Sequence, residues 1–213
     1  MKAADAAGLE LSIHALGDKG IDTVIEKMKD IAGDDIRGRR YRIEHFQHPT
    51  EAAIQALADA AIIASMQPYH AIDDGRWAEE RIGAERLKTT YAFRSILGAG
   101  GILTFGSDWP VAPLSPIEGV YAAVTRRTLD NANPDGWIAE QKISVEEALT
   151  AYTASNAYAF SEEETAGTLE IGKRADFVIL SADPRDIPSS GIAKITVQET
   201  IIAGDVVYSR PDR

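Results

Sequence analysis

Cysteine is absent from this sequence of 213 residues. Its absence excludes disulfide bonds, thiolate metal ligands and cysteine nucleophiles, and it suits a reducing compartment. The first residues lack the basic start and the apolar run of a signal peptide, and no stretch approaches the roughly 18 apolar residues that span a bilayer. We therefore expect a cytoplasmic protein that does not enter a membrane.

Positive charge is scarce as well. The 22 lysines and arginines stand against 33 aspartates and glutamates, which gives a formal net charge of -11 at pH 7. Nucleic acids and anionic lipid surfaces attract basic proteins and repel acidic ones. The sequence therefore predicts neither a nucleic-acid partner nor a membrane partner.

What the chain does contain is an alternation of short apolar runs and amphipathic segments over its first three-quarters. Strands are predicted at 9–16, 41–46, 61–68 and 101–110. Helices are predicted at 20–33, 50–60, 91–100, 115–127 and 144–160, and the polar stretch 70–83 is expected to be a loop. Four repeats of strand, loop and helix favour an α/β fold with a parallel sheet and right-handed crossovers.

Two helix starts carry recognisable signals. Asp18 can cap the helix that follows it. Ser144 and Glu147 have the spacing of a capping box, in which each side chain accepts a hydrogen bond from the backbone of the other residue. The second signal predicts that a helix begins directly after Ser144.

The number of repeats limits the possible architectures. A closed (β/α)₈ barrel usually needs about 250 residues, and only four units precede the last fifty residues here. The sequence therefore fits half of a barrel or a small, independent doubly wound sheet. The last fifty residues are strand-rich and broken by glycine and proline, so we expect a separate β element after an acidic turn near 162–167.

Polar side chains that can bind metal follow the predicted strands. All four histidines, His14, His45, His48 and His70, lie in the first seventy residues, and Asp108 follows the fourth strand. Imidazoles bind divalent metals such as zinc, and a carboxylate beside the metal can accept a proton from water. One histidine at a strand end is more often structural. The ordered set of His14, His45, His70 and Asp108 favours a metal-hydrolase site, whereas His48 is interpreted as structural.

Four segments, in this order, resemble the second half of the amidohydrolase superfamily barrel: SIHALGDKGID, RIEHFQHP, ASMQPYH and TFGSDWPV. The branch they resemble most is amidohydrolase family 3, which includes proteins similar to N-substituted formamide deformylases. The tail segments GTLEIGKRADFVIL and VQETIIAGDVVY resemble the C-terminal strands of the β-sandwich attached to such barrels. The resemblance implies a half barrel over 1–163, containing strands five to eight, and β-sandwich strands over 164–213.

The resemblance also implies roles for single residues. His14 and His45 match the metal-ligand histidines that end the fifth and sixth strands of the barrel. Asp108 matches the aspartate that touches the metal and serves as general base, and His70 is the candidate contact to the substrate carbonyl. The implied activity is hydrolysis of non-peptide C–N bonds in amide-type small molecules with a divalent metal, for which zinc is the first choice.

The sequence departs from the family in one important respect. The family's first strand supplies a His-x-His pair of ligands and its fourth a lysine that bridges two metals, but this sequence contains no His-x-His. We therefore expect an incomplete metal site with weak or absent metal binding, and a chain that is inactive unless the barrel is completed. One way to complete it is a homodimer through the exposed barrel edges at 9–16 and 101–107. The alternative function is a non-catalytic α/β module, or inactive fragment, that binds a partner.

Overall fold

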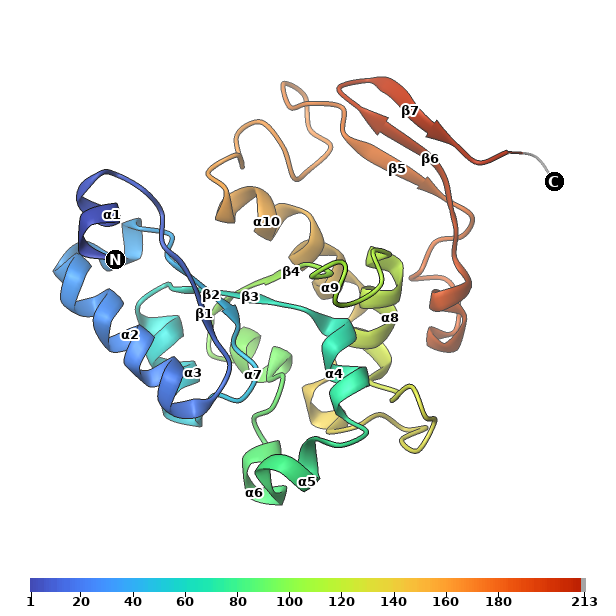
Figure 1. The fold of residues 1–213 in the computed structure, drawn as a ribbon. Helices are drawn as coiled ribbons and strands as arrows, with labels where there is room; N and C mark the ends of the chain where they lie inside the picture. The colour runs from blue at the N-terminus through green and yellow to red at the C-terminus, as the bar shows by residue number, and fades with distance from the viewer. Residues whose placement is uncertain (212–213) are drawn as a thin grey trace.

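The structure, a computed structural model, describes residues 1–211 and contains two β-sheets. The larger sheet has four strands in chain order, β1 (Ser12–Ala15), β2 (Arg42–His45), β3 (Ile63–Met66) and β4 (Ile102–Phe105). All neighbouring strands are parallel (Figure 1). The predicted parallel α/β sheet is thus confirmed, and each strand is shorter than the apolar run that indicated it.

Three helices cover one face of this sheet. α2 (Asp18–Ala32) packs beside β1, α3 (Glu51–Asp59) beside β3 and α7 (Phe93–Gly98) beside β4. These helices also touch one another in chain order and bury apolar side chains at helical spacing, including Ile21, Ile25, Met28, Ile54, Leu57, Phe93 and Ile96. Burial of this face fixes which way the strands point and therefore where their carboxyl ends lie.

The remaining helices lie mainly beyond the strand ends and beside β4. They are α1 (Lys2–Ala6), α4 (Pro68–Asp74), α5 (Ala78–Ile82), α6 (Ala84–Leu87), α8 (Pro116–Thr125), α9 (Val145–Tyr152) and α10 (Ala154–Ala159). Short 3-10 turns are η1 (Gly33–Gly38), η2 (Ala139–Gln141) and η3 (Ser189–Lys194). Among residues 1–211, no helix combines the length and the hydrophobicity that a bilayer span requires.

The two faces of the larger sheet differ in polarity. Ile43 faces the helices and is fully buried. On β1 and β2 the opposite face carries polar, partly exposed side chains, and there the Ser12 hydroxyl donates to Glu44 at 2.5 Å. On the same face, Arg42 pairs with Glu10 at 3.0 Å. This alternation follows from the two-residue period of a strand.

The smaller sheet is antiparallel and consists of β5 (Phe177–Leu180), β6 (Val197–Ile202) and β7 (Asp205–Ser209). Figure 1 shows it in orange and red at the C-terminal end of the chain. The expected β element in the tail is confirmed, while the domain division between 163 and 164 stays a prediction. Apolar side chains before and within this sheet are bare: Leu169 is 71% exposed and Ile171 fully exposed.

Three local expectations were wrong. The polar stretch 70–83 holds most of α4 and all of α5, because Pro68 starts a helix at its first position and Ala71 and Ile72 find a buried face. Asp18 is the first residue of α2 rather than its cap, which is Gly17. The helix expected over 144–160 is divided at Thr153 into α9 and α10. The capping box of Ser144 and Glu147 is confirmed.

Candidate metal site

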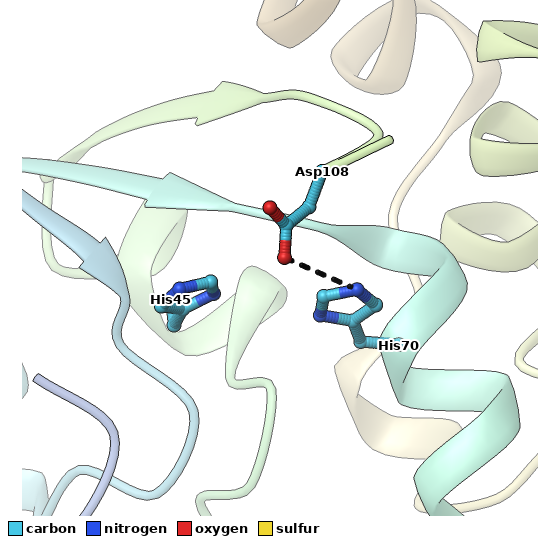
Figure 2. A group of neighbouring side chains, drawn as sticks. All are labelled: His45, His70 and Asp108. Atoms are coloured by element: carbon cyan, nitrogen blue, oxygen red, sulfur yellow. Dashed lines mark ion pairs between the residues drawn. The ribbon is translucent and has the colours of Figure 1, made fainter. Parts of the chain in front are cut away.

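Three side chains with metal-binding atoms meet at the carboxyl ends of the strands. His45 ends β2, His70 lies in the first turn of α4 just after β3, and Asp108 follows β4. Each offers one ligand atom, and these atoms all lie within 4.8 Å of one another (Figure 2). Two ligands at about 2.1 Å from one zinc ion are at most about 4.2 Å apart. The three side chains therefore need only small movements to close on a single cation.

The orientation of His45 is fixed by a buried amide. Its Nδ1 lies 2.8 Å from Oε1 of Gln67, and the Gln67 side chain is almost fully buried. Gln67 Nε2 donates to the Ser65 carbonyl at 3.4 Å, which identifies Oε1 as the acceptor facing the imidazole. Nδ1 of His45 is therefore the donor, so the Nε2 lone pair remains free to bind a metal.

Unusual backbone conformations occur where the site residues project. His45 has φ 74°, Phe46 has φ 45° and Asp108 has φ 58°, all in the left-handed region that non-glycine residues seldom adopt. Strict alternation along β2 would place His45 on the face of Ile43, toward the helices. Because the extended backbone ends at His45, its ring instead lies near that of His14, with centroids 4.8 Å apart.

His70 has a free nitrogen facing the site. Its Nε2 is buried, has no hydrogen-bond partner among the described residues, and lies 3.7 Å from Oδ2 of Asp108. Burial lowers the pKa of His70, while the negative charges of Asp108 and Asp74 oppose this shift. A neutral imidazole with an unpaired nitrogen is the form in which histidine binds metals. Sequence reasoning placed His70 at a strand end, whereas the structure places it in a helix.

His14 stands slightly apart from the other three residues. It lies in β1 and is exposed, beside His45 but outside the set whose ligand atoms lie within 4.8 Å of one another. The predicted ligand set of His14, His45 and Asp108 is therefore drawn together only in part, and it stays a prediction. His48 lies away from this set, and its Nδ1 contacts the Thr90 hydroxyl at 3.1 Å.

Sequence reasoning gave no role to several residues that surround the site. Gln67 follows β3 directly, which is a usable signal, but nothing in the sequence pairs it with His45. Gln47, Asp74 and Tyr91 form a largely buried hydrogen-bonded cluster close to the histidines. These three residues lie far apart in the sequence, so only the fold brings them together.

Comparison with known proteins agrees with this geometry. A profile described as the amidohydrolase family matches residues 1–208. Over 97% of its own length, the chain is 38% identical to Protein LONG AFTER FAR-RED 3 of Arabidopsis thaliana. Over 95% of its own length, it is 29% identical to the putative amidohydrolase YtcJ of Bacillus subtilis. Over 97% of its own length, it is 30% identical to the N-substituted formamide deformylase of Arthrobacter pascens.

Solved structures give the same result. An uncharacterized metal-dependent hydrolase from Pyrococcus horikoshii OT3 matches 88% of the chain with a TM-score of 0.76 and 29% identity. One from Pyrococcus furiosus matches 86% of the chain with a TM-score of 0.72 and 29% identity.

The match covers only part of each relative. The chain spans 35% of the Arabidopsis protein, 38% of the Bacillus protein and 36% to 37% of the two Pyrococcus hydrolases. Its four parallel strands and helices have the fold of the C-terminal half of an amidohydrolase (β/α)₈ barrel, followed by a separate antiparallel sheet. The chain belongs to the amidohydrolase family.

Proposed function

We propose that this chain supplies one side of the active site of a metal-dependent hydrolase that cleaves non-peptide, amide-type C–N bonds. The observation that carries the proposal is the meeting of His45, His70 and Asp108 within 4.8 Å at the carboxyl ends of three adjacent strands. In barrels of this kind, catalytic groups gather at that rim. The N-substituted formamide deformylase of Arthrobacter pascens, 30% identical, supports the substrate class.

The donor set fits a divalent cation, with zinc the first choice. His45 keeps Nε2 free because Nδ1 is engaged by Gln67. His70 holds an unpaired, buried Nε2, and Asp108 adds a carboxylate that is 36% exposed. Two imidazole nitrogens and a carboxylate form a common set of three protein ligands for zinc. His14, whose ring lies beside that of His45, is the next donor in reach.

Each residue has a distinct role in the proposed reaction. A divalent cation at this site supplies Lewis acidity. Asp108 takes a proton from the attacking water and later gives it to the departing nitrogen. His45 and Asp108 would hold the cation, with His14 as a further imidazole in reach. Nε2 of His70 faces Asp108, which places it where it can contact the substrate carbonyl or add a ligand to the cation.

Metal analysis of the purified chain tests this proposal. We expect zinc to bind and to be lost in the variants His45→Ala and Asp108→Ala, because each removes one of three donors. His48→Ala is the matched control, since His48 follows β2 closely but bonds to Thr90 instead of facing the site. If neither zinc nor manganese binds the wild-type chain, the proposal is wrong and the non-catalytic module remains.

The same titration separates the two roles of His70. If His70 is a ligand, His70→Ala weakens zinc binding as strongly as His14→Ala or more. If it contacts only substrate, His70→Ala leaves zinc affinity unchanged. We further propose that this chain alone does not hydrolyse N-substituted formamides, because His14, His45 and Asp108 lie on an open sheet of four strands. Turnover by the zinc-loaded chain would contradict this second statement.

A further inference from the structure

A triangle of hydrogen bonds, formed by Gln47, Asp74 and Tyr91, lies close to the two histidines of the site. The Tyr91 hydroxyl donates to Oδ2 of Asp74 at 2.6 Å, and Nε2 of Gln47 donates to the same oxygen at 3.0 Å. Gln47 Nε2 also contacts the Tyr91 hydroxyl, which closes the triangle. Its corners come from three places in the chain: the loop after β2, the end of α4 and the segment before α7.

Two corners of the triangle are shielded from water, and the third, Asp74, is half-buried. Tyr91 is fully buried and Gln47 nearly so. Burial raises the pKa of Asp74, although the Tyr91 hydrogen bond opposes that shift, and burial also raises the pKa of the Tyr91 phenol. In such surroundings an unpaired polar group costs far more than it does in water, so the three side chains are held in one arrangement.

Each of two corners is joined to one histidine of the site. Gln47 follows His45 by two residues. Asp74 follows His70 by four residues along α4, so the two side chains lie on the same side of that helix, one turn apart. The hydrogen bond between Gln47 and Asp74 therefore ties the segment that carries His45 to the helix that carries His70.

The third corner anchors the other two to the protein core. The Tyr91 backbone N–H donates to the Gln47 carbonyl at 2.8 Å. Buried Arg126 donates to the Tyr91 carbonyl at 3.0 Å and to the Thr90 carbonyl at 3.3 Å. The loop after β2 needs such support, because its first residues, His45 and Phe46, both have positive φ angles.

We propose that Gln47, Asp74 and Tyr91 are positioning residues, whose hydrogen-bonded triangle sets the separation and orientation of His45 and His70. This inference rests on the proposed metal site in so far as the two histidines act on a metal. It assigns the three residues no contact with metal or substrate. Groups that hydrogen-bond directly to metal ligands typically change metal affinity by 10- to 100-fold when they are mutated. The triangle acts instead through the segments that carry the two histidines.

The first experiment compares two tyrosine variants. Tyr91→Phe removes only the hydroxyl that joins the triangle. Tyr41→Phe is the control, because Tyr41 is equally buried and its hydroxyl also bonds to an aspartate, Asp5, but before the opposite end of β2. Titration with Co²⁺ should show at least about tenfold weaker binding for Tyr91→Phe and unchanged binding for Tyr41→Phe. Equal affinities for folded Tyr91→Phe and wild type would overturn the proposal.

A second measurement works without metal and separates this inference from the proposed function. Imidazole ¹⁵N signals of His45 and His70 in the metal-free protein should both move in Tyr91→Phe and in Gln47→Leu, and neither should move in Tyr41→Phe. If wild type binds no Co²⁺, the metal site is refuted while these signals still decide the role of the triangle. If Tyr91→Phe does not fold, Asp74→Asn replaces it, since that change keeps the side-chain shape. Unmoved signals in the folded variants refute positioning.

Discussion

Gln67 is the side chain on which the orientation of His45 depends, because its Oε1 accepts the Nδ1 hydrogen at 2.8 Å. The strand that carries it is easy to predict, but the pairing is not. It depends on the positive φ angle of His45, which turns the imidazole out of strict alternation. Sequence patterns report such backbone exceptions only for glycine, so this contact was beyond sequence reasoning.

Replacing Gln67 tests whether this hydrogen bond matters for metal binding. Gln67→Met removes the acceptor and keeps a side chain of similar length, so His45 is free to rotate and to change tautomer. We expect zinc affinity to fall about tenfold, measured by competition with a zinc chelator. Gln55→Met, on the surface of α3, should leave it unchanged. A Gln67→Met protein that binds zinc as tightly as wild type would show that His45 is oriented by other contacts.

His48 predicts how stability depends on pH. Burial lowers the pKa of His48 below its ordinary value of 6.5, and the weaker attractions of Asp74 and Asp18 only oppose this shift. In the unfolded chain the pKa of His48 is about 6.5. As the pH falls below that value, the unfolded state therefore binds more protons than the folded state. The contribution of the neutral His48 ring to the free energy of unfolding is therefore fully present above the pKa of the unfolded chain. It is lost as the pH falls toward and through the lowered pKa of the folded chain.

Chemical unfolding at about pH 7.5 and about pH 5.5 checks this sign. The free energy of unfolding should be lower at the acidic pH in the wild-type chain. His48→Asn, which keeps a polar group near Thr90 and cannot titrate, should reduce the difference. The interpretation of His48 as a half-buried, neutral structural residue is wrong if the variant and the wild type show the same pH dependence.

At the scale of secondary structure, the strands were the most predictable elements. β3 and β4 lie inside mostly apolar runs, and β1 and β2 lie where apolar and polar residues alternate, because strands of such sheets are buried on at least one face. The capping box at Ser144 was also predictable, because its two side chains are only three residues apart. α4 was not predictable, since its polar residues include Asp73 and Asp74, and Asp74 finds its partners 17 and 27 residues away.

Arg126 joins the end of α8 to two turns, one at Thr90 and Tyr91 and one at Trp137. It is the left-handed cap of α8 and is fully buried, with its guanidinium donating to the carbonyls of Trp137, Tyr91 and Thr90. Burial lowers the pKa of Arg126 to about 9, so the group is still a cation at neutral pH. The aromatic rings of Phe93 and Trp137 lie within 5.5 Å of it and stabilise that charge.

Removing the guanidinium should therefore be costly. Arg126→Met fills the space but leaves the Trp137 and Thr90 carbonyls without a donor, and each loss costs on the order of 1 kcal/mol or more. The Tyr91 carbonyl keeps the Phe93 N–H at 2.9 Å. We expect the free energy of unfolding to fall by about 2 kcal/mol, measured by urea denaturation. Arg127→Met, with one exposed hydrogen bond to the Pro134 carbonyl, is the matched control and should change little. Equal stability of the two variants would show that the carbonyls find other donors.

For the whole molecule, the larger sheet has two edges. The carbonyls of Leu11 and Ala15 point toward β2 and accept hydrogen bonds from β2 or from the loop that follows it. Because the backbone groups of successive residues in a strand point to opposite sides, Ser12 directs its backbone N–H away from the sheet. On the β4 side, Asn156 already donates to the Phe105 carbonyl at 2.9 Å. The β1 edge is therefore the freer of the two among the described residues.

We propose that two copies associate through these edges. Light scattering should give a mass of twice the 23.0 kDa of one chain at high protein concentration. Ser12→Pro removes an outward N–H from the β1 edge and should shift the mass toward that of one chain. Ser189→Pro, which introduces proline at an exposed position outside the sheet, is the control. Thr23→Pro would not serve, because Thr23 lies inside α2 and proline there would break the helix. A single-chain mass for wild type at every concentration contradicts the association.

The exposed side chains of Leu169 and Ile171 affect how long the chain persists in a cell. Chaperones and proteases act on chains that expose apolar surface. Leu169 and Ile171 present such surface even though the sheet beside them is formed. Whatever covers Leu169 and Ile171 would therefore raise the cellular abundance of the protein without touching any group at the metal site.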